Sequence, residues 1–215
     1  MAKLSKTLKG TAKVKNHRCA KAAKAEIRRN VLEAIGSAAK VLDAFAGSGE
    51  MYRAAWSDAA DYVGCDTKWE RDDRPAFVVD NRRLLRSIDL KPYTIFDLDS
   101  FGSPWEQAII IAARRQVNRG ERIGMVLTEG SGLKLKMGGL PRALAEIAGL
   151  SGKISGMGRW QDDVINRAIS GLAERMQCEI ESRWEARRPA GASMRYIGLV
   201  LCGIDRHERL GAGVA

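Results

Sequence analysis

Two glycines, Gly47 and Gly49, stand at the end of a short apolar run and have the clearest chemical potential in the chain. The run reads Val-Leu-Asp-Ala-Phe-Ala over residues 41 to 46, which predicts a strand that leads into a turn. Glycine lacks a Cβ atom, so its backbone can adopt a positive φ and approach a ligand closely. A helix is expected to begin after the turn and to present N–H groups without helical partners. This arrangement is typical of a loop that binds a nucleotide-type cofactor.

The spacing of the glycines argues against two common cofactor classes. A dinucleotide-binding loop needs a third glycine three residues after the second, and Tyr52 stands there. A phosphate-binding Walker loop ends in Gly-Lys-Ser/Thr, whereas here Gly49 is followed by Glu50 and Met51. NAD, FAD and ATP are therefore disfavoured.

The pattern D-x-F-x-G-x-G resembles the first motif of the class I S-adenosylmethionine (AdoMet) methyltransferases. The residues that the resemblance assigns to the cofactor loop are Asp43, Phe45, Ala46, Gly47 and Gly49. It further implies that an acid after the second strand binds the ribose hydroxyls, and Asp66 ends such a segment. A carboxylate suits a vicinal diol because it accepts two strong hydrogen bonds. The third expected strand ends at Asp80, which the resemblance places beside the adenine amino group.

The segment around residues 97 to 104 is the most specific motif. It reads Asp-Leu-Asp-Ser-Phe-Gly-Ser-Pro and resembles the D-x-D-P-F-G-S-P stretch of the tRNA guanine-N2-dimethyltransferases. The resemblance implies that Asp99 and the Ser100 carbonyl accept hydrogen bonds from an exocyclic amino group, while Phe101 stacks on the base. Ser100 replaces the family's proline, so we expect its carbonyl to be less rigidly aimed. Asp97 is expected to point to the opposite face and to serve cofactor binding or stability.

The same stretch also has an ordinary structural explanation. Ser103 could cap a helix, with Pro104 at its first position and Glu106 completing a capping box. Trp105 is a modest candidate for stacking on a base. A lone Gly-x-Gly could be only a tight turn, and Asp66 could be a helix cap. Four motifs in the right order at strand ends together favour the methyltransferase interpretation.

Positive charge is concentrated at the start of the chain. Residues 1 to 29 contain ten Lys or Arg and one acid, so they carry +9 of the formal net charge of +10. Such a segment is typical of a polyanion-binding arm, although it could also be a solvated tail. We assign residues 1 to 19 to a basic arm and residues 20 to 215 to a methyltransferase domain.

A glycine-rich stretch follows the fifth expected strand. Between residues 130 and 158 there are eight glycines, with Lys134, Lys136, Arg142 and Lys153 among them. We interpret the stretch as substrate-facing loops around a short helix; an ordinary glycine-rich connection is the alternative.

The whole pattern predicts an α/β fold. Strands alternate with helices from a first helix near residues 20 to 35, which Gly36 ends, to a strand over residues 122 to 128. A helix over residues 160 to 177 precedes two strands, residues 178 to 185 and 196 to 202, with a turn at 189 to 192. We therefore expect a doubly wound, mostly parallel seven-stranded sheet that ends in an antiparallel hairpin, as the resemblance implies.

Other features limit the functional classes. The four cysteines are isolated and there are two histidines, so neither a zinc site nor a disulfide framework is indicated. Apolar runs are too short to span a membrane, and no signal-peptide core follows the basic start, which makes a cytoplasmic protein the expectation.

The sequence predicts an AdoMet-dependent enzyme that methylates an exocyclic amino group of a base in nucleic acid, with RNA preferred over DNA. Three alternatives remain open at this point. They are a protein or small-molecule methyltransferase, a non-catalytic nucleic-acid-binding module with this fold, and an unrelated nucleotide-binding protein.

Overall fold

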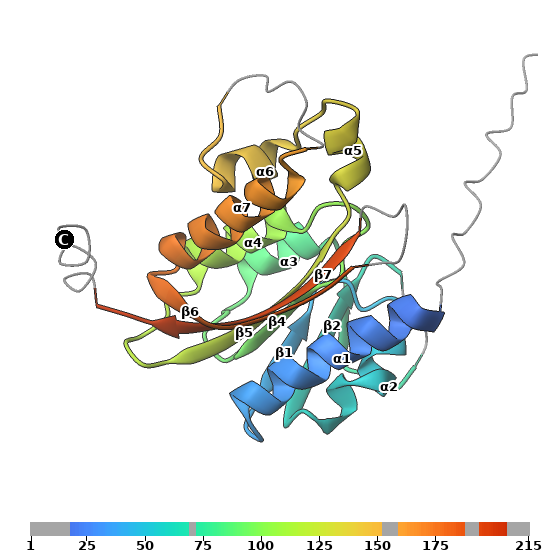
Figure 1. The fold of residues 1–215 in the computed structure, drawn as a ribbon. Coiled ribbons are helices and arrows are strands. Elements are labelled where there is room, and N and C mark those ends of the chain that lie inside the picture. The colour runs from blue at the N-terminus through green and yellow to red at the C-terminus, as the bar shows by residue number, and fades with distance from the viewer. Residues whose placement is uncertain (1–17, 69–71, 152–158, 188–193, 206–215) are drawn as a thin grey trace, which may run out of the picture.

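A seven-stranded mixed sheet forms the centre of the protein in a computed structural model that describes residues 18–68, 72–151, 159–187 and 194–205 (Figure 1). The strand order is β3-β2-β1-β4-β5-β7-β6. Only β7 and β6 run antiparallel to their neighbours, so the expected parallel sheet with a terminal hairpin is confirmed. The strands are β1 (Lys40–Asp43), β2 (Asp61–Asp66), β3 (Ala76–Val78), β4 (Ile95–Leu98), β5 (Arg122–Glu129), β6 (Cys178–Arg187) and β7 (Arg195–Gly203).

The strand order reverses between β1 and β4, which lie next to each other at the middle of the sheet. Asp43 at the end of β1 is in register with Asp97 in β4, and the Ala44 N–H donates to the Asp97 carbonyl over 3.0 Å. In open α/β sheets, ligands bind outside the carboxyl ends of the strands at such a switch point. The topology therefore brings the candidate residues after β1, β2 and β4 to one edge.

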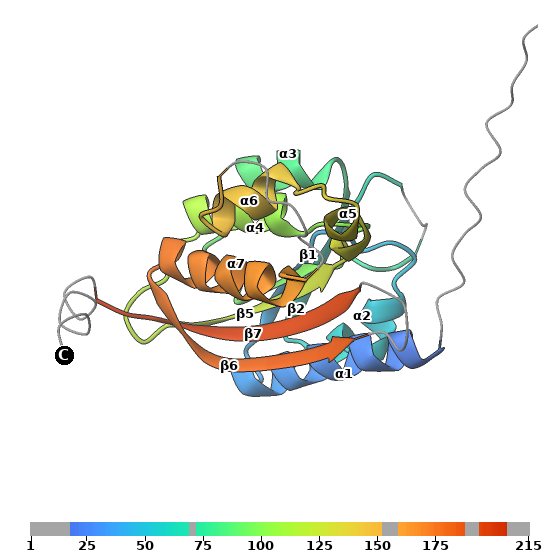
Figure 2. The same ribbon diagram turned by 45° about the horizontal axis from the view of Figure 1, so that its top comes forward.

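Helices cover both faces of the sheet (Figure 2). On one face lie α1 and the short α2; on the other, α3, α4, α6 and α7 pack over a large apolar core. The helices are α1 (Arg18–Ile35), α2 (Glu50–Ala54), α3 (Asn81–Ser87), α4 (Trp105–Arg114), α5 (Gly132–Lys136), α6 (Arg142–Ile147) and α7 (Gln161–Arg175), with a 3-10 turn η1 (Trp56–Asp58) after α2.

The first helix lies close to the sheet at two strand glycines that leave room for it. A Cβ atom on Gly124 in β5 would lie 2.5 Å from Val31, and one on Gly198 in β7 would lie 2.8 Å from Ile27. Gly36, with a φ of 98°, ends the helix as the sequence predicts. This close packing places the polar side chains of α1 at the sheet edge.

The start of α4 differs from the expected capping box. The helix begins at Trp105 with Pro104 as its N-cap, and no side chain caps it. The buried Ser103 hydroxyl has no partner among the described residues. The prediction was wrong by one residue, so the serine stands before the capping position. The expected turn at 189 to 192 lies outside the described residues.

Candidate active site at the carboxyl edge of the sheet

The glycine turn has the backbone geometry that the sequence predicts. Gly47 and Gly49 have φ values of 45° and 75°, in the left-handed region that favours glycine. The Gly49 N–H donates to the Ala46 carbonyl, and the Ala46 N–H donates to the Cys65 carbonyl, both over 3.0 Å. These bonds hold the turn directly beside the end of β2.

Asp66 ends β2 and faces the turn. Its Oδ2 accepts the Gly47 N–H over 3.0 Å, and its Oδ1 accepts the Lys68 N–H over 3.1 Å. The residue is only partly buried. Oδ1 also accepts from the Thr67 hydroxyl over 3.5 Å, and because a carboxylate has about four acceptor positions, Oδ2 can accept a further hydrogen bond. Asp66 can therefore bind a vicinal diol while it continues to brace the glycine turn, if the Thr67 hydroxyl turns away from Oδ1.

Arg74 lies across the turn, a position that was not predicted from the sequence. Its guanidinium donates to the carbonyls of Ala46 and Gly47 over 3.0 and 2.8 Å and pairs with Asp72. A Cβ atom on Gly49 would lie 2.6 Å from the Arg74 guanidinium carbon. The second glycine thus allows this arginine to lie against the backbone.

Asp43 is buried rather than exposed to a ligand. Its Oδ1 accepts the Phe45 N–H and its Oδ2 accepts the Tyr62 hydroxyl, each over 3.0 Å. Burial, together with the charge of Asp97, raises its pKa to about 8. Phe45 is half-buried and packs against the main core. Asp43 and Phe45 therefore support the turn from its buried side.

Asp97 is fully buried and bound by side chains from distant segments. Arg28 of α1 forms a bidentate pair with it, with N–O distances of 2.6 and 2.7 Å, and the Trp56 indole donates to it over 2.7 Å. Arg28 also lies 3.3 Å from Asp99. The prediction that Asp97 and Asp99 point to opposite faces was therefore wrong, because side chains two residues apart share one face of a strand.

Asp99 lies just beyond β4, where its side chain is 16% exposed. Both of its oxygens accept hydrogen bonds from the Lys24 ammonium, over 2.6 and 2.8 Å. Burial raises the pKa of Asp99, but the charges of Arg28 and Lys24 outweigh this effect and hold the pKa below its ordinary value. The group is thus an ionised acceptor at neutral pH.

Ser100 and Phe101 complete the motif in different ways. The Ser100 N–H donates to the Leu98 carbonyl over 2.8 Å, and its hydroxyl donates to the Thr128 carbonyl over 3.0 Å. These two bonds hold Ser100 in place, although it lacks the rigid ring of the proline that it replaces. The Phe101 side chain is 100% exposed at the same edge. A large, fully exposed aromatic side chain is available for stacking.

Asp80 has a structural role that accounts for its carboxylate. It caps α3 by accepting the N–H groups of Arg82 and Arg83, and it pairs with the Arg82 guanidinium at 2.9 Å. The Arg82 hydrogen bond lowers the pKa of Asp80 to about 2. A contact between Asp80 and a bound adenine remains a prediction.

Trp105 does not belong to the exposed site. Its side chain is 0% exposed, and its indole N–H donates to the Glu129 carboxyl over 2.5 Å. The suggestion that Trp105 stacks on a base was wrong, because the ring is enclosed in the core. Phe101 is the aromatic side chain of this segment that solvent reaches.

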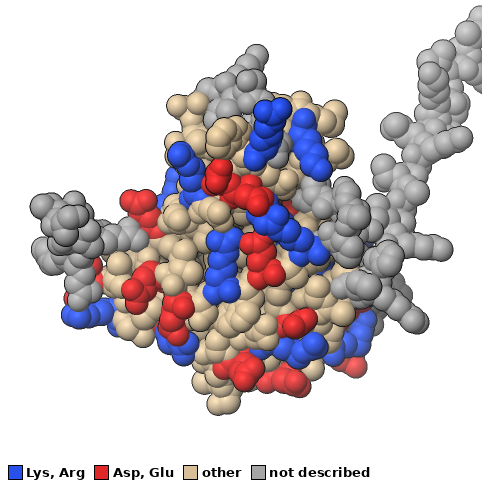
Figure 3. Space-filling view, viewed as in Figure 1, with Lys and Arg blue, Asp and Glu red and all other residues tan. Residues whose placement is uncertain are grey.

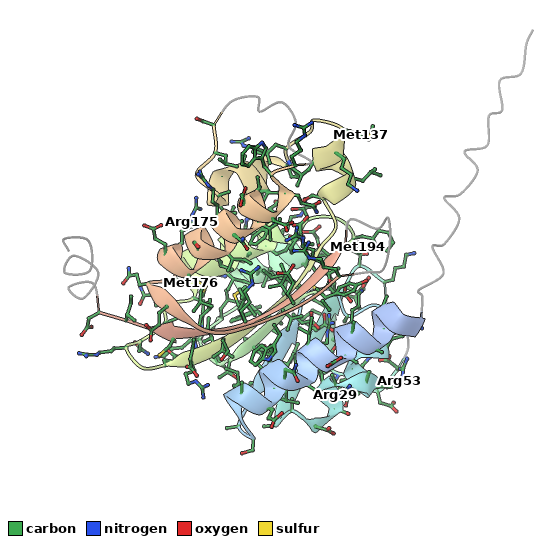
Figure 4. The ribbon with its side chains drawn as sticks, in the orientation of Figure 1. Arg29, Arg53, Met137, Arg175, Met176 and Met194 are labelled. Atoms are coloured by element: carbon green, nitrogen blue, oxygen red, sulfur yellow. The ribbon has the colours of Figure 1, made fainter. Side chains whose placement is uncertain are left out.

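Of the ten positive side chains in residues 1 to 29, the structure describes the contacts of four. Residues 1 to 17 lie outside the described part. On α1, Lys21 pairs with Glu50, Lys24 with Asp99 and Arg28 with Asp97, while Arg29 donates to the Ala54 carbonyl. Figure 4 shows Arg29 on the side of α1 that adjoins α2 and Arg53. These four cations are bound within the fold and are not part of a free arm.

Lys24 and Arg28 are the site residues that sequence reasoning missed. Lys21, Lys24 and Arg28 stand at helical spacing on an alanine-rich helix, so they share one face. A basic stripe on a helix otherwise expected to pack against a sheet was the available signal. Its acidic partners could not be located, since Asp99 is 75 residues away from Lys24.

The glycine-rich stretch after β5 contains α5, which adjoins the motif after β4. The Gly130 N–H donates to the Gly102 carbonyl over 2.5 Å, next to Phe101. Leu133 and Met137 are 63% and 80% exposed, and Met137 is labelled at α5 in Figure 4. Lys134 and Lys136 are also exposed, whereas Lys153 lies outside the described residues. That these loops face a substrate remains a prediction.

Comparison with solved structures identifies the fold that carries this site. Trm1 from Pyrococcus horikoshii in complex with S-adenosyl-L-methionine matches with a TM-score of 0.56 and 15% identity, over 86% of this chain and 56% of Trm1. The N-methyltransferase NodS from Bradyrhizobium japonicum, in complex with S-adenosyl-L-homocysteine, matches with a TM-score of 0.53 and 7% identity, over 89% and 90% of the two chains. The chain has the class I methyltransferase fold.

The similarity to these proteins is one of fold and identifies neither a sequence family nor a substrate. No family model and no curated protein sequence matches the chain. It spans little more than half of the Trm1 chain, and the two matched structures are named for different methyltransferases. Among the residues that the structure describes, no helix is long and apolar enough to cross a membrane.

Proposed function

We propose that the protein is an AdoMet-dependent methyltransferase that acts on an exocyclic amino group of a nucleic-acid base, with RNA preferred over DNA. The observation that carries the proposal is the arrangement after β4. An ionised acceptor, Asp99, and a fully exposed ring, Phe101, flank a fixed serine at the same edge of the sheet as the glycine turn. An amino group attached to an aromatic ring needs an acceptor and a stacking surface of this kind.

The residues around the turn fit AdoMet. Asp66 has acceptor capacity for the two ribose hydroxyls, and the positive φ values of Gly47 and Gly49 open the backbone toward a ligand. Ala46 and Phe45 form the turn itself, while Asp43 and Asp97 brace it from within. Asp80 would face the adenine. When bound, AdoMet supplies a methyl group on a positively charged sulfur.

In the proposed reaction bound AdoMet would supply the methyl group to the amino nitrogen and would be left as its neutral thioether. The nitrogen would release one proton to water. Asp99 accepts an N–H of the amino group, which orients the nitrogen lone pair; the Ser100 carbonyl serves as a second acceptor, and Phe101 holds the base plane. A base within a duplex must first leave the stack.

The electrostatic surroundings of Asp99 favour a neutral amino group over a charged amine. Lys24 and Arg28 approach its carboxylate to 2.6 and 3.3 Å, so its negative charge is already paired and attracts a protonated aliphatic amine less than an unpaired carboxylate would. Amino groups on nucleobases are uncharged at neutral pH. This observation favours a base over a lysine side chain or a small aliphatic amine as substrate.

The test is methyl transfer from labelled AdoMet to total tRNA, rRNA and genomic DNA, followed by nucleoside analysis. We expect label in an N-methylated base, with RNA labelled above DNA. Label in added protein or small amines, with none in nucleic acid, would favour the protein or small-molecule alternative. Binding of RNA with no transfer to any acceptor would favour a non-catalytic module.

Cofactor binding can be tested separately by thermal unfolding. Saturating AdoMet or S-adenosylhomocysteine should raise the melting temperature, because a ligand that binds only the folded state stabilises it. Asp66→Ala should strongly reduce the shift. Asp61→Ala should leave it unchanged, because Asp61 is the exposed first residue of β2, at the opposite end of the strand from Asp66. A wild-type melting curve that does not respond to the cofactor would disprove the AdoMet assignment.

A further inference from the structure

The Lys24 ammonium lies at the accessible edge of the candidate site. Its side chain is 13% exposed, against 16% for Asp99, whereas Arg28 beneath them is 0% exposed. The ammonium also lies 5.4 Å from the centroid of the Tyr196 ring, which is a favourable position for a cation. Helix α1 thus delivers one buried charge that holds Asp97 and one accessible charge that meets Asp99.

The hydrogen-bond capacity of this pair is not exhausted. An ammonium has three N–H donors, and Lys24 directs two bonds at Asp99. The Asp99 carboxylate has about four acceptor positions; Lys24 hydrogen-bonds to two of them, and Arg28 lies at ion-pair distance, 3.3 Å, from Oδ2. A donor on Lys24 and an acceptor on Asp99 therefore remain side by side, and Asp99 stands two residues before the exposed Phe101.

We propose that Lys24 and Asp99 together bind two adjacent atoms of the substrate base, with Lys24 donating to the ring nitrogen and Asp99 accepting from the amino group beside it. This inference rests on the proposed function and names the chemical edge that the site recognises. Adenine, cytosine and guanine each carry an amino group on a carbon next to an acceptor ring nitrogen. Lys24 is a specificity residue that contacts the substrate.

The proposed contact serves recognition rather than activation. A hydrogen bond from an ammonium to the ring nitrogen withdraws electron density from the base, so it does not make the amino group more nucleophilic. Loss of Lys24 should therefore act mainly on KM and less on kcat. Loss of Asp99, which orients the attacking nitrogen, should act mainly on kcat.

The experiment pairs one protein substitution with one atom removed from the substrate. The substrates are two oligonucleotides. One contains the base that becomes methylated, and the other contains its deaza analogue, in which a C–H group replaces the acceptor ring nitrogen next to the carbon that carries the amino group. The proteins are full-length wild type, Lys24→Met and Lys24→Gln. Lys21→Met is the matched control, since Lys21 lies one helical turn away and pairs with Glu50 instead.

We expect wild type and Lys21→Met to disfavour the deaza analogue by about 10- to 100-fold in kcat/KM, the effect of losing one hydrogen bond to a charged group. Lys24→Met should lose a similar factor on the natural base and show no further loss on the analogue. Lys24→Gln, which keeps a donor, should retain part of the discrimination. The AdoMet-induced melting shift, unchanged in each variant, establishes that the variants are folded.

Two results would overturn the proposal in distinguishable ways. Equal discrimination against the analogue by wild type and Lys24→Met would show that Lys24 does not contact the ring nitrogen, while base methylation stands. Absence of transfer by wild type to any nucleic acid would disprove the proposed function, and the role of Lys24 with it.

Discussion

Three aspartates at the ends of β1 and β4 have different electrostatic surroundings despite their proximity. Asp43 is buried beside a tyrosine hydroxyl, Asp97 is enclosed by Arg28 and Trp56, and Asp99 is partly exposed beside Lys24. Burial raises the pKa of the first two, whereas nearby cations lower that of Asp99. Only Asp99 combines an ionised carboxylate with access to a substrate.

Replacement of Asp99 should separate transfer from cofactor binding. We expect Asp99→Ala to lower methyl transfer by on the order of 10²-fold, which is typical for the loss of one well-placed electrostatic group. The AdoMet-induced melting shift should stay near that of wild type, because Asp66 and the glycine turn are untouched. Single-turnover transfer measures the effect, with Asp61→Ala as control; undiminished transfer by Asp99→Ala would refute the assigned role.

Asp43 should make stability depend on pH. Because its folded pKa, about 8, exceeds the ordinary value of 3.8, the folded state holds a proton that the unfolded state has released between these pH values. Unfolding free energy should therefore fall as pH rises through this window, by up to about 1.4 kcal/mol per pH unit for one proton. Asp43→Asn should flatten the dependence, since an amide can still accept from Phe45 and donate to Tyr62.

Urea denaturation of wild type and Asp43→Asn between about pH 4 and pH 8 measures this effect. The two curves should converge at low pH and separate as pH rises, with the variant the more stable at pH 8. Parallel curves would show that the Asp43 carboxyl titrates near its ordinary value. Asp61→Asn, on the exposed start of β2, is the control and should follow wild type.

At the scale of elements, α1 organises the site as well as covering the sheet. Its apolar side packs into space left by Gly124 and Gly198, and its polar side reaches Asp97 and Asp99. Arg28 is fully buried and offsets carboxylates contributed by two different strands. The helix is therefore tied to the sheet edge by charge and by close packing at once.

Removal of the buried cation should be strongly destabilising. Arg28→Met leaves Asp97 without its ion pair in the interior, and breaking a buried pair from one side costs about 3–5 kcal/mol. The double variant Arg28→Met/Asp97→Asn should recover part of the loss, because it removes the uncompensated charge. Urea denaturation measures both, with the exposed Arg29→Met as control; a loss for Arg28→Met no larger than that control's would contradict the electrostatic explanation.

At the scale of the whole molecule, the folded part has both acidic and basic side chains on its surface, whereas the start of the chain is basic. On the face seen in Figure 3, basic and acidic side chains are interspersed. Residues 1 to 17, by contrast, contain five lysines and no acid, and they join the fold at the beginning of α1. Since a helix rises about 1.5 Å per residue, the segment joins the fold roughly 9 Å along the helix from Lys24.

Deletion of residues 1 to 17 should lower the salt dependence of RNA binding. Each phosphate contact contributes about 0.7 to the slope of log affinity against log salt on single strands and about 0.9 on duplex DNA. Loss of five lysines should thus flatten the slope by up to about 3.5 on single-stranded RNA, while AdoMet affinity stays the same. A salt titration of both proteins measures this, and equal slopes would identify the segment as a solvated tail.

Much of the fold could be predicted from the sequence because its signals are local. The glycine turn follows from residue type and positive φ, and the alternation of strands and helices predicts a parallel sheet. In such a sheet the residues after β1, β2 and β4 must meet at one edge, so the candidate positions of Asp66 and Asp99 required no knowledge of packing. The capping box at Ser103 failed because helix starts depend on details within one residue.

What only the tertiary structure decided is the state of each charged group. Arg28 and Lys24 meet Asp97 and Asp99 across 69 and 75 residues of sequence, and no spacing rule reports such distances. Burial likewise separated the enclosed Trp105 from the exposed Phe101, although both belong to one short motif. Local sequence determines which residues gather at the sheet edge, whereas the packing of α1 and the depth of burial determine which of them are charged, paired and accessible.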